Sequence, residues 1–143
     1  REDTPAVAAV VTCGPVRQDG IQERGMDGFD TLLQMYRETL PEKRATLERE
    51  RQAVLAGVLP EAHAQVLRRE LHNLSGSGGA YGFDAMGEMA RQLEKRWAQW
   101  LAHPAPRPDP AVLSAELEGL WNALMAWIEA AAAPGQAEPD QRG

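Results

Sequence analysis

His72 is the residue whose type and surroundings are best suited to chemistry. The apolar residues near it recur with helical spacing, at about 100° per residue around the helix axis. The centre of this apolar stripe lies about 120° from His72 on the helical wheel. The stripe consists of Ala64, Leu67, Leu71, Leu74 and Gly78. We therefore expect the imidazole to face solvent. An imidazole with the ordinary pKa of about 6.5 is mostly neutral at cytosolic pH and can act as a nucleophile.

The residues on the same helix face as His72 suit a group that accepts a phosphoryl group. Within about 60° of it on the wheel lie Gln65, Arg68, Arg69, Ser75, Gly76 and Gly79. The arginines can attract a phosphoryl group or an acidic partner surface. Gly76, one turn after the histidine, removes bulk that would keep another protein's phosphoaspartate from the ring. In the sequence, no second catalytic group is seen to pair with His72, which favours a carrier over a hydrolase.

The segment Leu71–Phe83 resembles the signature of histidine-containing phosphotransfer (Hpt) domains. That pattern has a histidine, a leucine two residues later, a glycine followed by a serine, and a second glycine further on. The matching residues here are His72, Leu74, Gly76, Ser77 and Gly82. Family members typically continue with a helix that ends in a Leu-Glu pair, matched by Leu93-Glu94. The resemblance covers residues 27 to 130, and it implies a four-helix bundle in which His72 is the phosphoacceptor.

One position departs from the family pattern. Members often carry a lysine three residues after the histidine, where its charge can neutralise the phosphoryl group, and this chain has Ser75 there. The departure does not move the expected site away from His72. It leaves open which group meets the phosphoryl charge, and we hypothesise that Arg68 or Arg69 does so.

Other residues that could do chemistry have simpler interpretations. His63 lies about 180° from His72 on the wheel, so it cannot share a site with it and is expected to be structural. His103 lies in a proline-rich loop and is expected to be incidental. The run Ser75–Gly79 is rich in glycine, but it lacks the Gly-Lys-Ser/Thr ending and the preceding strand of a nucleotide-binding loop.

Helical periodicity extends over most of the chain, and no segment has a convincing strand pattern. The expected helices cover residues 27–40, 41–58, 61–77, 84–101 and 113–128. Pro41 suits the first turn of the second helix, Asp84 suits an N-cap, and Trp97 and Trp127 have the spacing of core residues. The prediction is an all-α fold, an antiparallel four-helix bundle with a short additional N-terminal helix. Residues 1–25 are expected to be a tail or interdomain linker, 26–133 the bundle and 134–143 a polar tail.

Composition excludes several classes of function. The 143 residues include 21 acidic and 15 basic ones, a net charge of −6, so a nucleic acid is not an expected partner. The lone Cys13 excludes an internal disulfide and a cysteine-type zinc site, and no metal site is expected. No apolar run approaches the about 18 residues that would span a bilayer. We expect a cytoplasmic monomer, and a chain that begins at Arg1 suggests a piece of a larger protein such as a hybrid sensor kinase.

The resemblance implies a phosphoryl carrier rather than an enzyme, since the chain has no ATP-binding kinase motif. The neutral imidazole of His72 would attack a phosphoaspartate on a docked response-regulator receiver domain and then pass the phosphoryl group to a second receiver. No cofactor of its own is expected, because Mg²⁺ and the catalytic side chains would belong to the receiver. A histidine kinase is a further possible partner. The alternatives are a helical docking module that binds a receiver or kinase without being phosphorylated, and a plain structural or dimerisation domain.

Overall fold

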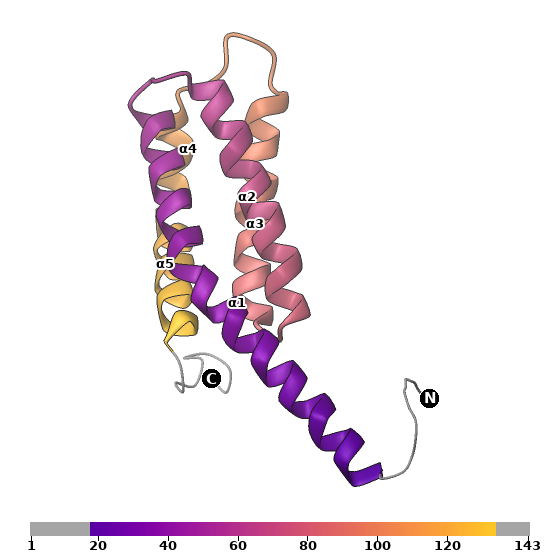
Figure 1. Ribbon diagram of the computed structural model, residues 1–143. Coiled ribbons are helices and arrows are strands. Elements are labelled where there is room, and N and C mark those ends of the chain that lie inside the picture. Colours follow the sequence, from indigo (N-terminus) through magenta and orange to yellow (C-terminus); the bar gives the residue numbers. More distant parts are fainter. Residues whose placement is uncertain (1–17, 134–143) are drawn as a thin grey trace. The chain divides into compact units, whose positions relative to one another are not determined.

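The computed structural model describes residues 18–133, and this part of the chain is helical, without a strand (Figure 1). Its helices are α1 (Gln18–Leu55), α2 (Pro60–Ala80), α3 (Asp84–Ala102), α4 (Pro110–Glu116) and α5 (Glu118–Ala132). The chain divides into two compact units, Arg1–Tyr36 and Arg37–Gly143. In the second unit, the rest of α1, then α2, α3 and the α4–α5 pair run in alternating directions. The predicted all-α bundle is confirmed. The expectations for residues 1–17 and 134–143 lie outside the described residues.

The first helix differs from the expected one. It begins at Gln18 rather than Asp27, and it passes through Pro41 without a break. The segment expected as a short additional N-terminal helix is therefore the first part of α1. A proline inside a helix removes one backbone hydrogen bond and crowds the preceding turn. Here Pro41 is exposed, so water can reach the carbonyl that loses its donor, and side-chain anchors at Arg37 and Arg44 fix the helix on both sides.

Those anchors belong to a row of arginines that attaches α1 to the last two helices. The arginines are spaced by seven residues, which is about two helical turns, so they share one face of α1. The hydrogen bonds run from Arg37 to the carbonyl oxygen of Ala131 (2.7 Å), from Arg44 to that of Met125 (3.1 Å) and from Arg51 to the hydroxyl of Ser114 (2.9 Å). The guanidinium of Arg51 also lies 4.7 Å from the ring centroid of Trp121. These contacts fix α1 against α4 and α5 along most of the bundle.

The other helices differ from the expected ones mainly at their ends. Asp84 is the first residue of α3 rather than its N-cap, which is Phe83. The helix expected over residues 113–128 is divided at Leu117 into α4 and α5. The break is slight, because Leu117 still donates its N–H to the carbonyl of Leu113 (3.0 Å) and accepts a bond from Trp121 (2.8 Å).

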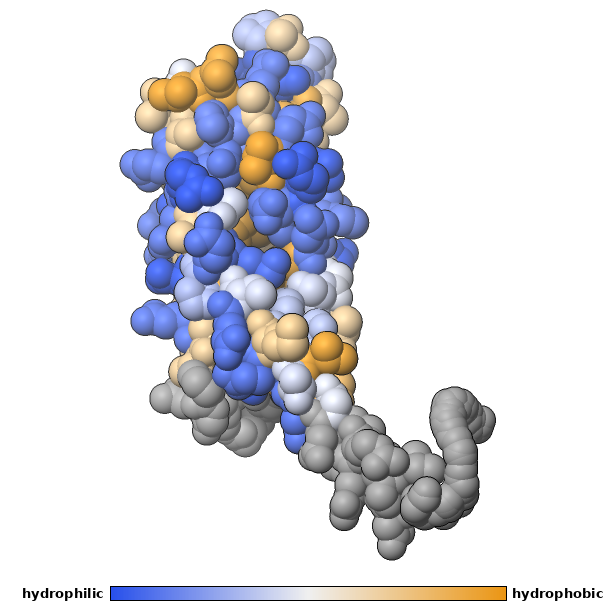
Figure 2. Space-filling model, in the orientation of Figure 1, coloured by the Kyte–Doolittle hydropathy of each residue, from blue (hydrophilic) through white to orange (hydrophobic). Residues whose placement is uncertain are grey.

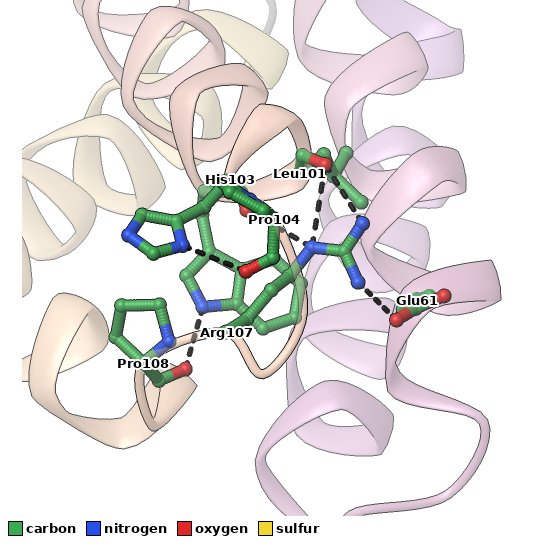
Figure 3. A network of polar contacts seen from close by, with 7 residues as sticks. Glu61, Leu101, His103, Pro104, Arg107 and Pro108 are labelled. Atoms are coloured by element: carbon green, nitrogen blue, oxygen red, sulfur yellow. Dashed lines mark hydrogen bonds and ion pairs between the residues drawn. The ribbon is translucent and has the colours of Figure 1, made fainter.

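Arg107 fastens the loop between α3 and α4 (Figure 3). Its guanidinium donates to the carbonyl oxygens of Leu101 (2.8 Å) and Trp100 (3.1 Å), and it pairs with Glu61 on α2. The indole N–H of Trp100 donates to the carbonyl of Pro108 (2.8 Å). The arginine thus satisfies carbonyl groups at the C-terminus of α3 that have no partner within the helix.

The apolar stripe predicted for α2 is buried, and Ala64, Leu67, Leu71, Leu74 and Gly78 all belong to the interior. Trp97 and Trp127 are buried as predicted. The face of the molecule seen in Figure 2 is mostly hydrophilic, with scattered apolar residues, as expected for a bundle that buries one stripe of each helix. The predicted orientation of α2, and with it the side on which His72 emerges, is therefore correct.

Helices α2 and α3 approach each other closely where Gly78 faces Gly87. A Cβ atom added at Gly87 would lie 3.0 Å from the carbonyl oxygen of Ser75, and one added at Gly78 would lie 3.3 Å from the backbone nitrogen of Gly87. The connecting turn contains Gly82 at a positive φ of 89°, and Phe83 donates its N–H to the carbonyl of Gly78 (2.7 Å). The glycine contact and the tight turn together set the register of this helical hairpin.

Candidate functional site

His72 projects from the exposed face of α2, and 68% of its side chain is accessible to solvent. Gly76 and Gly79 follow it on the same face and are also exposed. A Cβ atom added at either glycine would meet no atom within 4 Å. The surface on the C-terminal side of the imidazole is therefore open, and a second protein can approach the ring from there.

Glu94 on α3 lies beside His72, and this was not expected from the sequence. Its Oε1 lies 3.6 Å from Nδ1 of His72, and only 19% of its side chain is exposed. The separation exceeds the about 3.2 Å of a hydrogen bond, but such contacts in catalytic sites often tighten only when the partner is bound. The structure therefore places a carboxylate beside His72 that the sequence alone did not pair with it. In the sequence, the Leu93-Glu94 pair stands out only through its match to the family pattern, and it lies within α3 rather than at its end.

The hairpin register explains why Glu94 reaches His72. The two residues lie at nearly equal distances along α2 and α3 from the contact between Gly78 and Gly87. Because antiparallel helices advance equally per residue, positions equally far from a crossing point face each other. Leu93 is fully buried, and this turns its neighbour Glu94 toward the boundary between the two helices.

The arginines that precede His72 have different surroundings. Arg68 is half-buried, and its Nη1 lies 3.4 Å from Oε2 of Glu94. Arg69 is exposed and makes no hydrogen bond or ion pair with any of the residues that the structure describes. One carboxylate thus faces both His72 and Arg68, one oxygen toward each, whereas Arg69 is not paired with this carboxylate.

The other predicted site residues lie on the same helix, farther from this carboxylate. Gln65 is exposed, two turns before His72. Ser75, which occupies the position of the family's lysine, is half-buried, and its carbonyl oxygen faces Gly87. Its short neutral side chain carries no charge that could meet a phosphoryl group.

A family model described as "Hpt domain" matches residues 31–127. The chain belongs to the Hpt domain family. Membership implies histidine phosphotransfer in two-component signalling, and Hpt domains are phosphoryl carriers rather than enzymes. Family members generally interact with receiver domains and kinases. No match was found among curated proteins or among solved structures.

On α3 of this Hpt domain, next to the candidate site, a second cluster of charges surrounds Glu88. Arg91 donates two hydrogen bonds to this carboxylate (3.0 and 2.7 Å) and Gln92 donates a third (3.1 Å). These bonds lower the pKa of Glu88 from 4.5 to about 2. The pairing with Glu88 is also the main reason that the pKa of Arg91 is raised, with a smaller contribution from the charge of Glu94. Arg91 is therefore engaged by Glu88, although it lies near the carboxylate that faces His72.

The two other histidines of the Hpt domain lie away from His72. Nδ1 of His63 lies 2.5 Å from Oε1 of the buried Glu50, so this histidine joins α2 to α1, in line with the structural role expected for it. His103 is exposed after the end of α3, with its Nδ1 2.9 Å from the carbonyl oxygen of Pro104. Within residues 18–133, the His, Cys, Asp and Glu side chains that the structure describes nowhere gather in threes as a metal ion would require. None of the helices in that range has the length and hydrophobicity of a bilayer-spanning segment.

Proposed function

We propose that this Hpt domain carries a phosphoryl group on Nε2 of His72 and relays it between aspartate-bearing receiver domains. The observation that carries the proposal is the pairing of an exposed imidazole with a largely buried carboxylate on its Nδ1 side. The open surface that Gly76 and Gly79 leave beside the ring supports it, because a phosphoaspartate is presented by another protein and needs access.

Glu94 gives the imidazole a preferred orientation. A carboxylate on the Nδ1 side favours the neutral tautomer that has its proton on Nδ1, and the lone pair then lies on Nε2. Nδ1 is the nitrogen that lies beside Glu94, and the side chain is mostly exposed, so Nε2 is left for the phosphorus atom of a receiver. A fixed tautomer and a fixed ring both contribute to transfer, because the nucleophilic atom is placed before the partner docks.

The transfer needs no acid or base from this chain. The Nε2 lone pair forms a bond to phosphorus while the bond from phosphorus to the aspartyl oxygen breaks, and the receiver recovers its carboxylate. The imidazole keeps its Nδ1 proton and becomes a phosphorylated imidazolium, whose positive charge Glu94 offsets. Reversal of the same step delivers the phosphoryl group to the second receiver. Mg²⁺, which assists both steps by neutralising charge on the transferred group, is expected on the receiver.

The arrangement favours retention of the phosphoryl group over hydrolysis. Glu94 lies on the Nδ1 side of the ring, opposite Nε2, so its carboxylate is poorly placed to activate a water that attacks phosphorus. The alternative function, a docking module that is not phosphorylated, uses the same exposed face, but it gives no role to the carboxylate beside Nδ1.

The proposal is tested by phosphoryl transfer from a panel of phosphorylated receiver domains to the native chain and to His72→Gln. His103→Gln is the matched control, because His103 is an exposed histidine outside the site. We expect label that is labile to acid and stable to base on the native chain and the control, and none on His72→Gln. Binding of a receiver without label on the native chain would favour the docking module, and label that persists in His72→Gln would place the phosphoacceptor elsewhere.

A further inference from the structure

We propose that Arg68 is the cationic group that meets the phosphoryl group on His72, and that Glu94 positions it there until transfer occurs. This inference rests on the proposed function. A phosphoryl group on a side chain carries a charge of about −1.5 to −2 at neutral pH, so its stability depends on a nearby cation. The position where the family often has lysine is the neutral Ser75, so the cation must come from another part of the domain.

Arg68 and His72 both lie next to the carboxylate of Glu94. Its Nη1 lies 3.4 Å from one oxygen of Glu94, and the other oxygen of the same carboxylate lies 3.6 Å from Nδ1 of His72. Residues four apart on a helix are neighbours on its surface, and helical side chains lean toward the N-terminus. The ring of His72 therefore leans toward the turn that carries Arg68. A guanidinium also offers paired N–H groups that match phosphate oxygens.

Three other arginines of α2 and α3 are less well placed. Arg91 directs both its Nε and its Nη2 to Glu88 at 3.0 and 2.7 Å, contacts shorter than the one that Arg68 makes. Arg96 is paired with Glu116 at 2.8 Å, toward α4. Arg69 is exposed and shares no polar partner with His72 among the described residues. Arg68 alone among these four is linked to the imidazole through a common carboxylate, and its single 3.4 Å contact is easily exchanged.

Phosphorylation would make the three side chains exchange partners. Before transfer, the carboxylate of Glu94 is paired with Arg68 and faces Nδ1 of His72. After transfer, the imidazolium beside Glu94 carries a positive charge that can pair with this carboxylate in place of Arg68. The doubly charged phosphoryl group attracts Arg68 more strongly than the singly charged carboxylate does. No atom is gained or lost in this exchange. Arg68 therefore stabilises the phosphohistidine relative to the phosphoaspartate of the receiver, and it should shift the equilibrium between them.

The test measures this equilibrium, because the distribution of label at equilibrium does not depend on how fast the partners dock. A phosphorylated receiver is incubated with the native chain, Arg68→Ala, Arg68→Lys, Arg69→Ala or Arg49→Ala until the distribution is constant. Arg49 is the control, since it is exposed on α1 and bonds only to Thr46 among the described residues. We expect Arg68→Ala to shift the equilibrium about tenfold toward the receiver, the usual effect of one charge-assisted hydrogen bond, with partial recovery in Arg68→Lys. Arg69→Ala and Arg49→Ala should stay within about twofold of the native chain.

A second measurement separates this role from a structural one. The side-chain Nε–H resonance of Arg68 should move when the native chain is phosphorylated, and that of Arg69 should not, whereas a purely structural Arg68 would keep its resonance. An unchanged equilibrium in Arg68→Ala, or an equal shift in Arg69→Ala, would overturn the assignment. A native chain that accepts no phosphoryl group would instead refute the proposed function, and this inference with it.

Discussion

Gly76 is predicted to lower the stability of the Hpt domain while it keeps the phosphoacceptor accessible. The residue lies inside α2, and a Cβ atom added there would meet no atom within 4 Å. Alanine is favoured over glycine in a helix interior by about 1 kcal/mol, so Gly76→Ala should increase the free energy of unfolding by that amount. For a domain of about 100 residues this corresponds to a melting temperature higher by about 5 °C.

A larger side chain at the same position should separate stability from function. Side chains on a helix lean toward its N-terminus, so a leucine at position 76 would lean over the ring of His72. Gly76→Leu should therefore keep most of the stability gain, since leucine is nearly as good a helix former as alanine. The rate of transfer from a receiver should fall on the order of 100-fold, because keeping the reacting groups apart by even about 1 Å can cost that much.

Two measurements on the same samples check this prediction. Thermal unfolding followed by circular dichroism gives the stability, and the initial rate of label transfer from a phosphorylated receiver gives the function. Gly119→Leu is the matched control, because Gly119 is an exposed helical glycine on α5 with equally open surroundings. Its transfer rate should equal that of the native chain. A Gly76→Leu variant that transfers at the native rate would show that the open surface has no role in access, and a loss of stability in Gly76→Ala would refute the description of α2.

The remaining predictions concern the scaffold. Arg51→Ala should lower the free energy of unfolding, measured in urea, by about 1 to 2 kcal/mol. The change removes the cation that stacks on Trp121 and leaves the buried hydroxyl of Ser114 without its donor. The control Arg49→Ala should change the free energy of unfolding by less than about 0.5 kcal/mol. Gly87→Ala should cost about 1 to 3 kcal/mol, since its methyl group would lie 3.0 Å from a carbonyl oxygen of α2, and an unchanged urea midpoint would contradict the close contact. The pKa of Glu88, read by NMR, should be about 2 and rise toward 4.5 in Arg91→Ala. Because this pKa is lowered on folding, the stability that the pairing provides is present above pH 4.5 and is lost as the pH falls toward 2.

The exposed face of α2 could be predicted because it depends only on the periodicity of one helix. Once the buried stripe is identified, a rotation of 100° per residue fixes where His72 and Gly76 emerge. Glu94 could not be placed in the same way. Its proximity to His72 depends on the register between two helices, which is set by the backbone contact of Gly78 and Gly87. In the sequence Gly78 falls on the buried stripe of its helix, but periodicity within one helix does not show that it meets Gly87 of the next.

The course of α1 was mispredicted for a related reason. Proline is a local signal for the end or start of a helix, and Pro41 was therefore expected to separate two helices. Tertiary contacts override this local signal. On either side of Pro41, Arg37 and Arg44 donate hydrogen bonds to backbone carbonyl oxygens of α5. Such contacts depend on which helix lies alongside, and periodicity within α1 contains no information about that.

If Arg68 is the cation that meets the phosphoryl group, the charges around His72 suit a side chain that must both accept this group and release it. In the resting site the positive charge of Arg68 is paired with the negative charge of Glu94 beside His72, so these two charges offset each other. A permanently unpaired cation would bind phosphate tightly and would resist release of the phosphoryl group to a second receiver. Arg68, in contrast, is paired with Glu94 before transfer and with the phosphoryl group after it. It therefore stabilises the phosphorylated form only by the difference in free energy between these two pairings. That smaller stabilisation suits a group that must be accepted from one protein and given up to another.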